Sequence, residues 1–402
     1  MRILHISSGA RGGAAVAAQR LAAAQSEAGD ETLVVDINYV TLSGVNKLDE
    51  IKRKCLSGMQ QFFTKKEYGV ITPYSYPYLK LGIVKNFKPN VIHIHNWYNM
   101  VNYSLIKELS KFCPLVFTLH DERLLTGGCH NTLGCILNNN GCQKCPATSF
   151  MRQSVESDYL QKANLFKLLP RYAIVAPSDW LAKKATESNL FATAHQLTKI
   201  VNIIDSNFES LSTDTKFQNG EEFKILFIAA DITVKLKGFQ ILRKAFEDLA
   251  KQSKNIKYNL TAVGAPNDET IVVDSNATII YKKPMGQAEL RELINQSSIL
   301  VVPSLADNAP NIIAESQLVG TIVVASNVGG IPEMIEDQIT GFLTLPNKRD
   351  LMNCIFKVQQ SPIELLDKIR REALRQALIR YDSERIIEKY MKLYSSLEEC
   401  KT

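Results

Sequence analysis

The sequence contains no long apolar run, although 45% of its 402 residues are apolar. A transmembrane helix needs about 20 consecutive apolar residues, so we expect none. The N-terminus, MRILHISSG, also lacks a charged segment followed by an apolar stretch of about 7–15 residues, which is the pattern of a secretory signal. We therefore predict a cytoplasmic protein.

Neither sign of charge dominates the chain, whose formal net charge is +6. The positive charge is concentrated in the first half, which has 23 Lys and Arg against 15 Asp and Glu up to Asp205, while the remainder has 24 against 26. A basic half attracts anionic surfaces. We expect a lipid diphosphate or, as a peripheral partner, the inner surface of the cytoplasmic membrane, and no nucleic acid.

Cysteine is concentrated in one segment, and eight cysteines in a cytosolic chain argue against a disulfide framework. The segment HDERLLTGGCHNTLGCILNNNGCQKCPA contains Cys129, Cys135, Cys142 and Cys145. Four thiolates in a loop rich in Gly and Asn fit a tetrahedral structural zinc site, in which His130 could replace one cysteine. Reduced free thiols and an iron–sulfur cluster are the alternatives.

Short apolar segments alternate with helical ones along the whole chain. The expected strands are 2–7, 32–37, 91–95, 114–120 and 172–178 in a first series, and 224–229, 258–264, 278–282, 298–304 and 321–326 in a second. Each is rich in Val, Ile or Leu, as buried parallel strands are. An Ala-rich helical segment that stops at Gly29 joins the first two strands into a β-α-β unit. The predicted fold class is α/β, with two Rossmann-like, doubly wound parallel sheets.

The two series of strands define the expected domains. An N-terminal domain covers 1–205 and contains the cysteine-rich loop 121–146, and a C-terminal domain covers 223–382. The polar, turn-rich residues 206–222 form the linker between them. Residues 383–402 form an amphipathic helix with apolar residues at helical spacing. Ligands of such folds bind at the carboxyl ends of the strands, so we expect a cleft between the two domains to hold the site.

Two carboxylates in SLADNAPNIIAES predict a site for a diphosphate that has hydroxyl groups on both sides. Asp307 follows an expected strand, and Glu315 lies about one and a half turns into the next helix, which begins near Pro310. The first turn of that helix, with Asn311, presents N–H groups to a phosphate. Glu315 can then accept hydrogen bonds from a ribose. The alternative is a capped helix on which Glu315 is merely solvated.

Two further segments follow strands of the same domain. VGGIPEMI places Gly329 and Gly330 where the backbone can approach a ligand closely. KLKG places Lys237 directly before a helix that starts at Gly238, and a lysine at that point can neutralise a phosphate. A surface lysine is the alternative interpretation.

The segment PSLADNAPNIIAESQLVGTIVVASNVGGIPEMI resembles the signature of the family-4 retaining glycosyltransferases, the glycosyl transferases group 1. The resemblance extends to SSGARGGAAVAAQRLA, VIHIHNW, TLHDE, APSDWLA and VNIIDSNF, and so covers nearly the whole chain. It implies the GT-B fold, a nucleotide-sugar donor, and no cofactor or metal required for catalysis. A similar cysteine-containing loop occurs in some relatives that build bacterial exopolysaccharides.

The resemblance also implies roles for single residues. Asp307 matches the acid that contacts the transferred sugar, and Glu315 matches the acid that holds the ribose. Lys237 matches the lysine that binds the phosphates. Gly12 and Gly13 match the loop near the diphosphate and the acceptor, and His120 matches a histidine of the sugar and acceptor pocket.

Two positions depart from the family pattern. Asp307 stands where the family has Glu, and Ile232 stands where it often has Arg, so that Lys235 would substitute as a point charge. The predicted function is retaining transfer of a sugar to a polyprenyl-linked oligosaccharide or another saccharide in surface polysaccharide assembly. The alternatives are a nucleotide-sugar epimerase or hydrolase of the same fold, and a non-catalytic nucleotide-sugar-binding subunit.

Overall fold

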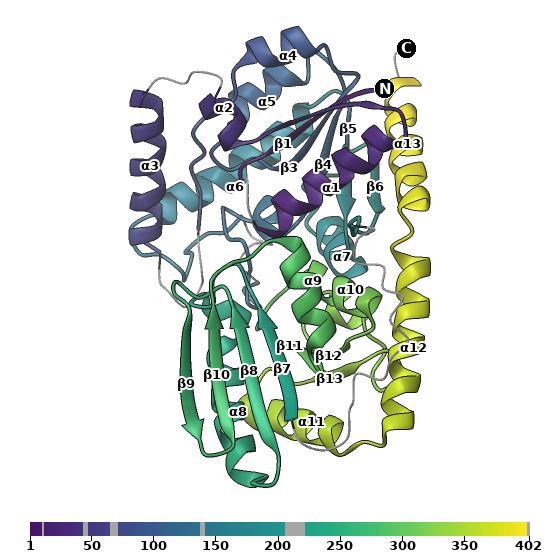
Figure 1. Ribbon diagram of the computed structural model, residues 1–402. Coiled ribbons are helices and arrows are strands. Elements are labelled where there is room, and N and C mark those ends of the chain that lie inside the picture. The colour runs from purple at the N-terminus through teal and green to yellow at the C-terminus, as the bar shows by residue number, and fades with distance from the viewer. Residues whose placement is uncertain (10–11, 43–46, 65–70, 137–140, 206–221, 400–402) are drawn as a thin grey trace. The chain divides into compact units, whose positions relative to one another are not determined.

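The computed structural model in Figure 1 describes residues 1–9, 12–42, 47–64, 71–136, 141–205 and 222–399. The chain forms two compact units. The first comprises Met1–Ile203 together with Ser383–Thr402, and the second comprises Ile204–Asp382. Most of the expected linker, residues 206–221, lies outside the described residues.

The first unit is built on a six-stranded parallel sheet with the strand order β2-β1-β3-β4-β5-β6. Its strands are β1 (Arg2–Ser7), β2 (Glu31–Val35), β3 (Val91–Asn96), β4 (Leu115–Thr118), β5 (Tyr172–Ala176) and β6 (Gln196–Lys199). Its helices are α1 (Gly13–Glu27), α2 (Ile37–Leu42), α3 (Lys47–Phe62), α4 (Leu81–Phe87), α5 (Tyr103–Leu109), α6 (Arg152–Leu168), α7 (Asp179–Glu187) and α13 (Ser383–Glu399). The strand order reverses between β1 and β3, which is the point where such folds bind ligands.

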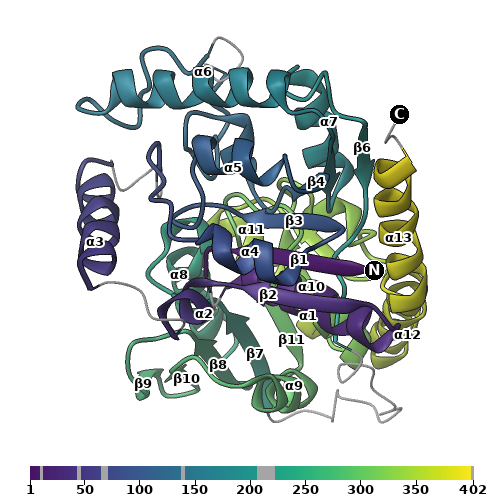
Figure 2. The ribbon, with the colours of Figure 1, turned by 90° about the horizontal axis from the view of Figure 1, so that it is seen from above.

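Helices form layers on the two faces of this sheet (Figure 2), and alternate strand residues belong to two different cores. Leu4 and Ile6 of β1 belong to a core that also includes residues of α4, α5 and α6. Ile3 belongs to a second core with Leu21 of α1 and with α13. This alternation with period two is what a buried, two-sided sheet requires. The amphipathic helix expected at the C-terminus is therefore α13, and it packs in the first unit through its apolar face: Ile386, Tyr390, Leu393, Tyr394 and Leu397.

The second unit contains a seven-stranded sheet with the order β13-β12-β11-β7-β8-β10-β9. Its strands are β7 (Glu222–Ile228), β8 (Lys257–Val263), β9 (Glu269–Asp274), β10 (Ala277–Lys282), β11 (Ile299–Val302), β12 (Ile322–Ser326) and β13 (Phe342–Thr344). Its helices are α8 (Phe239–Gln252), α9 (Gln287–Gln296), α10 (Asn311–Val319), α11 (Lys348–Gln360) and α12 (Ile363–Arg380). All pairings are parallel except that of the edge strand β9 with β10. The predicted class, α/β with two parallel sheets, is confirmed.

Three strands were not predicted from the sequence, and each lies at or near the edge of a sheet. β6 (QLTK) and β13 (FLT) are short, and no residue of β9 (ETIVVD) is buried. Edge strands have water on one side, so they lack the continuous apolar runs by which the central strands are recognised. No helix in the described part of the chain combines the length and the apolar character needed to cross a membrane.

The attachment of α13 to the first sheet can be tested through Tyr394. Its hydroxyl is completely buried, lies 2.7 Å from His93 Nδ1 and accepts a hydrogen bond from Gln25 Nε2 at 3.3 Å. Tyr394→Phe leaves both partners buried without the hydroxyl, so the free energy of unfolding should fall by about 1–3 kcal/mol. Both tryptophans, Trp97 and Trp180, lie in the first unit, so tryptophan fluorescence in urea reports on that unit alone.

The matched control replaces an exposed tyrosine of the same unit. Tyr39→Phe should change the free energy of unfolding by less than about 0.5 kcal/mol. Equal losses in the two variants would show that the buried hydroxyl does not hold α13 in place.

Candidate functional site

In the second unit, Lys237 and Asp307 meet where the order of the sheet reverses. β7 leads to β8 on one side, and the chain later returns to place β11 on the other side of β7. Lys237 follows β7, in the 3-10 helix Lys235–Lys237, and Asp307 follows β11. Lys237 Nζ lies 2.7 Å from Asp307 Oδ2, and Ser304 Oγ donates to the same carboxylate oxygen at 3.2 Å. Two opposite charges therefore lie at the carboxyl ends of the two central strands.

Glycines allow the backbone segments around this pair to touch. Gly329 has φ 59°, and a Cβ atom there would lie 1.8 Å from the carbonyl oxygen of Asp307. Gly238 has φ 73°, and its Cβ would lie 1.8 Å from the carbonyl oxygen of Pro303. Gly330 N–H donates to the Asp307 carbonyl at 3.1 Å. The predicted glycine turn and the predicted acid are thus in direct backbone contact, and no larger residue fits at 238 or 329.

The helix α10, which contains Glu315, follows Asp307 directly along the chain. α10 begins at Asn311, and its N-cap residue, Pro310, provides no side-chain cap. The positive end of the helix dipole lies at this turn, where Ile313 N–H donates to Pro310 O at 3.0 Å. Glu315 is only 7% exposed, so the alternative of a merely solvated Glu315 is wrong. Glu315 is therefore an interior residue of this part of the second unit.

The position that the family often gives to Arg lies in the core. Ile232 is 8% exposed, packs in the hydrophobic core of the second unit, and donates its N–H to Gly264 O at 3.1 Å. Lys235 is exposed, whereas Lys237 is partly buried and paired with Asp307. The fixed positive charge beside Asp307 therefore comes from Lys237.

The remaining predicted residues lie in the first unit. Gly12 is the N-cap of α1, has φ 95°, and follows β1. Among the described residues, apart from the chain neighbours and the backbone of α1 itself, no atom lies within 4 Å of the position that a Cβ would take at Gly12 or Gly13. His120 follows β4 and lines a small cavity of about 20 Å³ with His95, which lies on β3.

His120 is the end of a chain of hydrogen-bonded side chains through the interior. His120 Nε2 lies 3.2 Å from His95 Nδ1, and His95 Nε2 lies 3.1 Å from His5 Nδ1. His5 Nε2 lies 2.9 Å from the side-chain oxygen of Gln25. His5, His95 and Gln25 are all buried, as is His93 beside them. Four of the six histidines thus occupy one face of the sheet, the face covered by α1 and α13.

The chain of hydrogen bonds determines the tautomers. The Gln25 oxygen can only accept, so His5 Nε2 donates to it and His5 Nδ1 must accept from His95 Nε2. His95 Nδ1 then accepts from His120 Nε2. Neutral His120 consequently carries its proton on Nε2 and its lone pair on Nδ1. The side-chain amide of Gln25, on α1, thereby determines through His5 and His95 which nitrogen of His120 carries the proton.

Burial keeps these histidines neutral. It lowers the pKa of His5 and of His120 to about 4, and it lowers the pKa of His93 and His95 well below the ordinary value. A neutral His120 can accept a hydrogen bond from a hydroxyl group at neutral pH.

Sequence reasoning identified His120 but missed the residues behind it. The available signal was the alternation of His with apolar residues in RILHIS and VIHIHN, which places His5, His93 and His95 on one side of two strands. The register, in which His5 pairs with His93, becomes visible only once the sheet is known. Gln25 and Tyr394 come from α1 and α13, and nothing in the sequence links them to the strands.

The four cysteines of the long segment after His120 line one cavity in the first unit. They are free thiols in the structure, and burial raises the pKa of Cys142 to about 11. The thiols of Cys129 and Cys145 also have pKa values raised by burial.

Superposition on solved structures identifies the fold of this chain. Sucrose-phosphate synthase from Thermosynechococcus elongatus superposes with a TM-score of 0.65 at 14% identity, covering 98% of both chains. Anabaena Alr3699/HepE in complex with UDP gives 0.64 at 17% identity, covering 99% of this chain and 100% of that one. The chain has the GT-B fold of these glycosyltransferases.

Sequence comparison finds a family match within the second unit. Residues 222–360 match the model described as Glycosyl transferases group 1, so the second unit contains a group 1 glycosyltransferase domain. The D-inositol 3-phosphate glycosyltransferase of Paenarthrobacter aurescens (strain TC1) is 28% identical over 149 residues, which are 35% of this chain and 36% of that relative. The match thus spans only about a third of that protein.

A second relative aligns over most of the chain. The putative colanic acid biosynthesis glycosyl transferase WcaC of Escherichia coli (strain K12) is 25% identical over 342 residues, 78% of each protein.

The neutral histidines predict an acid-sensitive first unit. Unfolding exposes them to water, where they bind protons near pH 6.5, whereas in the folded state they do so only near or below pH 4. The unfolded chain therefore binds more protons between these values. The free energy of unfolding should fall as the pH decreases from about 6.5 towards 4, by up to about 1.4 kcal/mol per pH unit for each histidine.

Urea unfolding followed by tryptophan fluorescence at about pH 7.5 and pH 5.5 measures this slope. His5→Gln should reduce the slope, because one titrating group is removed, and His195→Gln, at an exposed position, should leave it unchanged. A wild-type stability that is constant over this range would contradict the assignment of neutral buried histidines.

Proposed function

We propose that this protein is a retaining glycosyltransferase that moves a sugar from a nucleoside-diphosphate sugar to a saccharide acceptor. The observation that carries the proposal is the Lys237–Asp307 pair at the point where the second sheet reverses its order. Open α/β sheets bind their ligands at this point. The pair combines a cation for phosphate with a carboxylate for sugar hydroxyls.

The donor would bind with its diphosphate between Lys237 and the first turn of α10. Lys237 Nζ and the start of α10 would then face the negative charge that develops on the leaving diphosphate. Glu315, further along α10, would accept hydrogen bonds from the ribose. The backbone at Gly329 and Gly330, in contact with Asp307, would line the phosphates.

The ion pair suggests how Lys237 acts during the reaction. Without donor, Asp307 neutralises Lys237 and holds its ammonium group in position. Cleavage of the bond between the sugar carbon and the phosphate oxygen leaves a nucleoside diphosphate that gains negative charge. Lys237 would then attract the phosphate in addition to Asp307. Its electrostatic stabilisation would therefore be greater in the transition state than in the bound ground state. We expect turnover without added divalent metal.

Retention follows if the acceptor attacks from the side of the leaving group. The acceptor hydroxyl forms the new bond to the sugar carbon, the diphosphate departs with the bonding pair, and a phosphate oxygen takes the hydroxyl proton. No protein base is needed for this step. Neutral His120, with its lone pair on Nδ1, would hold the acceptor or the sugar by a hydrogen bond.

The acceptor we propose is a polyprenyl-linked or other growing saccharide of a surface polysaccharide. The support is the match to WcaC, a putative colanic acid biosynthesis enzyme by name, along 78% of the chain. The excess of basic residues before Asp205 suits an acceptor with a lipid diphosphate at the inner face of the cytoplasmic membrane. The support for a nucleotide-sugar donor is that Anabaena Alr3699/HepE has been crystallised with UDP and with UDP-glucose.

A panel of nucleotide sugars, scored by released nucleoside diphosphate, tests the proposal. Lys237→Ala should lower turnover by about 10²–10³, the scale of one lost electrostatic contact in the transition state. Glu315→Ala should act mainly by weakening donor binding. Lys244→Ala, which removes an exposed lysine of α8, should leave turnover unchanged.

Two outcomes would contradict the proposal. Rapid donor turnover that does not depend on acceptor would indicate a hydrolase or epimerase of the same fold. Full activity in Lys237→Ala would show that the Lys237–Asp307 pair is not the site of the diphosphate.

A further inference from the structure

The segment that follows His120 is long and lacks regular structure. After the 3-10 helix Glu122–Leu125, the described residues of 126–151 contain neither a helix nor a strand, apart from an isolated bridge between Cys129 and Ile71. Segments of this length without secondary structure are uncommon in compact domains. Parts of this one are nevertheless buried, including Thr132 and Ala147. Something other than backbone ladders must hold it in place.

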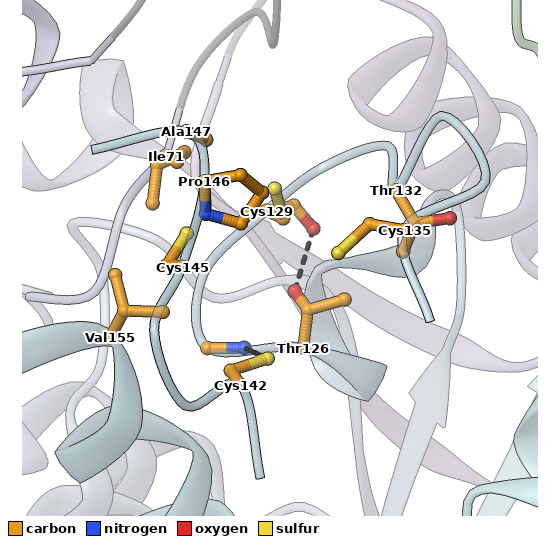
Figure 3. Close-up of a pocket in the computed structure, with 11 residues that line it drawn as sticks. Ile71, Thr126, Cys129, Thr132, Cys135, Cys142, Cys145, Pro146, Ala147 and Val155 are labelled. Atoms are coloured by element: carbon orange, nitrogen blue, oxygen red, sulfur yellow. Dashed lines mark hydrogen bonds between the residues drawn. The ribbon is translucent and has the colours of Figure 1, made fainter. Parts of the chain in front are cut away.

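Four cysteines surround one cavity inside this segment, as Figure 3 shows. The cavity has a volume of about 30 Å³, and its remaining lining is mostly apolar, with Ile71, Ala147 and Val155. The side chains come from positions far apart in the segment, and Figure 3 shows the sulfur of Cys135 turned towards the common space. About 10–15 Å³ of such space is enough for a water molecule, so this cavity has room for a single ion.

Backbone N–H groups lie close to the sulfur atoms around the cavity. Cys142 and Lys144 both have positive φ, at 59° and 56°, in a tight turn that ends at Cys145. Gly127 N–H donates to Cys142 Sγ at 3.1 Å. The backbone N–H groups of Ala147 and Thr148 act on the Cys145 thiol and oppose the rise of its pKa that burial causes. N–H donors around sulfur are the outer contacts that support thiolate ligands of a metal.

The surroundings and the ligand set agree with this arrangement. The fully buried Lys162 of α6 acts electrostatically on Cys142 and is itself paired with Asp158 at 2.8 Å. His130 is not available as a ligand, because Nδ1 lies 2.7 Å from Asp121 Oδ2 and Nε2 lies 3.3 Å from Thr72 Oγ1. The four cysteines are therefore the ligand set.

We propose that Cys129, Cys135, Cys142 and Cys145 bind one zinc ion, which fixes this segment beside His120. Zinc bound by four cysteines is tetrahedral, with Zn–S distances of about 2.3 Å, so its sulfurs lie roughly 3.8 Å apart. Among the described residues, only the ligand atoms of His5, His93 and His95 form a group of three within 4.8 Å of one another. The cysteine sulfurs are more widely spread, so zinc binding draws them together.

The zinc site would act on the residues next to His120. Between the first two cysteine ligands lie His130, which is paired with Asp121, and Thr132, which donates to Glu122 through its N–H at 2.7 Å and its hydroxyl at 2.9 Å. Asp121 and Glu122 directly follow His120. Anchoring the segment therefore also fixes the chain on the C-terminal side of His120.

Metal analysis of the full chain, purified under reducing conditions without chelator, tests the proposal directly. We expect about one zinc ion per chain in the wild type. Cys142→Ser and the less buried Cys135→Ser should each lower the zinc content by about tenfold or more. Cys55→Ser, at an exposed cysteine of α3, should retain the wild-type zinc content.

Thermal unfolding followed by tryptophan fluorescence provides a second measurement. A chelator should lower the midpoint of the first unit, and zinc but not magnesium should restore it. Cobalt substitution should give the intense visible absorption of a tetrahedral thiolate site.

Three results would overturn the proposal. They are wild-type protein without bound metal, iron in place of zinc, and zinc content that is equal in Cys142→Ser, Cys135→Ser and wild type. None of these measurements involves donor or acceptor, so the zinc site can fail while the proposed transferase activity stands, and the reverse.

Discussion

The contact between Lys237 and Asp307 depends on the winding of the second sheet. β7 and β11 are neighbours in the sheet although three strands, β8, β9 and β10, lie between them along the chain. The segments that follow their carboxyl ends therefore bring a lysine and an aspartate together. The glycines at 238 and 329 let three turns approach without space for a side chain. The helix α10 starts beside this pair because it is the continuation of β11. The strand order, the glycine turns and the Lys237–Asp307 pair thus lie at one point of the sheet, and this is where we propose that the diphosphate and the sugar bind.

In the first unit, a buried layer of hydrogen-bonded histidines lies on one face of the sheet. Its sheet is covered on one side by an apolar layer, but on the other side four histidines replace aliphatic residues near the carboxyl ends of β1, β3 and β4. Such a layer is stable only if every polar group has a partner, because buried polar groups are costly when unpaired. Gln25 from α1 and Tyr394 from α13 supply partners. The C-terminal helix therefore contributes polar contacts as well as apolar packing to the first unit.

The central strands and the repeated β-α-β pattern could be predicted because buried parallel strands are continuous apolar runs. The edge strands β6, β9 and β13 could not be predicted, because β6 and β13 are short and β9 has no buried residue. At the site, the sequence predicted that the glycine turn at 329–330 lies beside Asp307, and the structure has the two in backbone contact. Residue 232 shows the limit of this approach: a position that the family often fills with a charged side chain faces the core here, and Ile232 packs in it. The histidine network required strand register and the docking of two helices, neither of which a single sequence contains.

Amide hydrogen exchange, followed by mass spectrometry on the full chain with saturating UDP, GDP or ADP, tests the central claim most directly. If the nucleoside diphosphate binds at the reversal point of the second sheet, at least one of these ligands slows exchange in three segments: residues 235–238, the first turn of α10, and the turn at Gly329 and Gly330. The account is contradicted if none of the three ligands protects these segments, or if protection falls only on other parts of the chain.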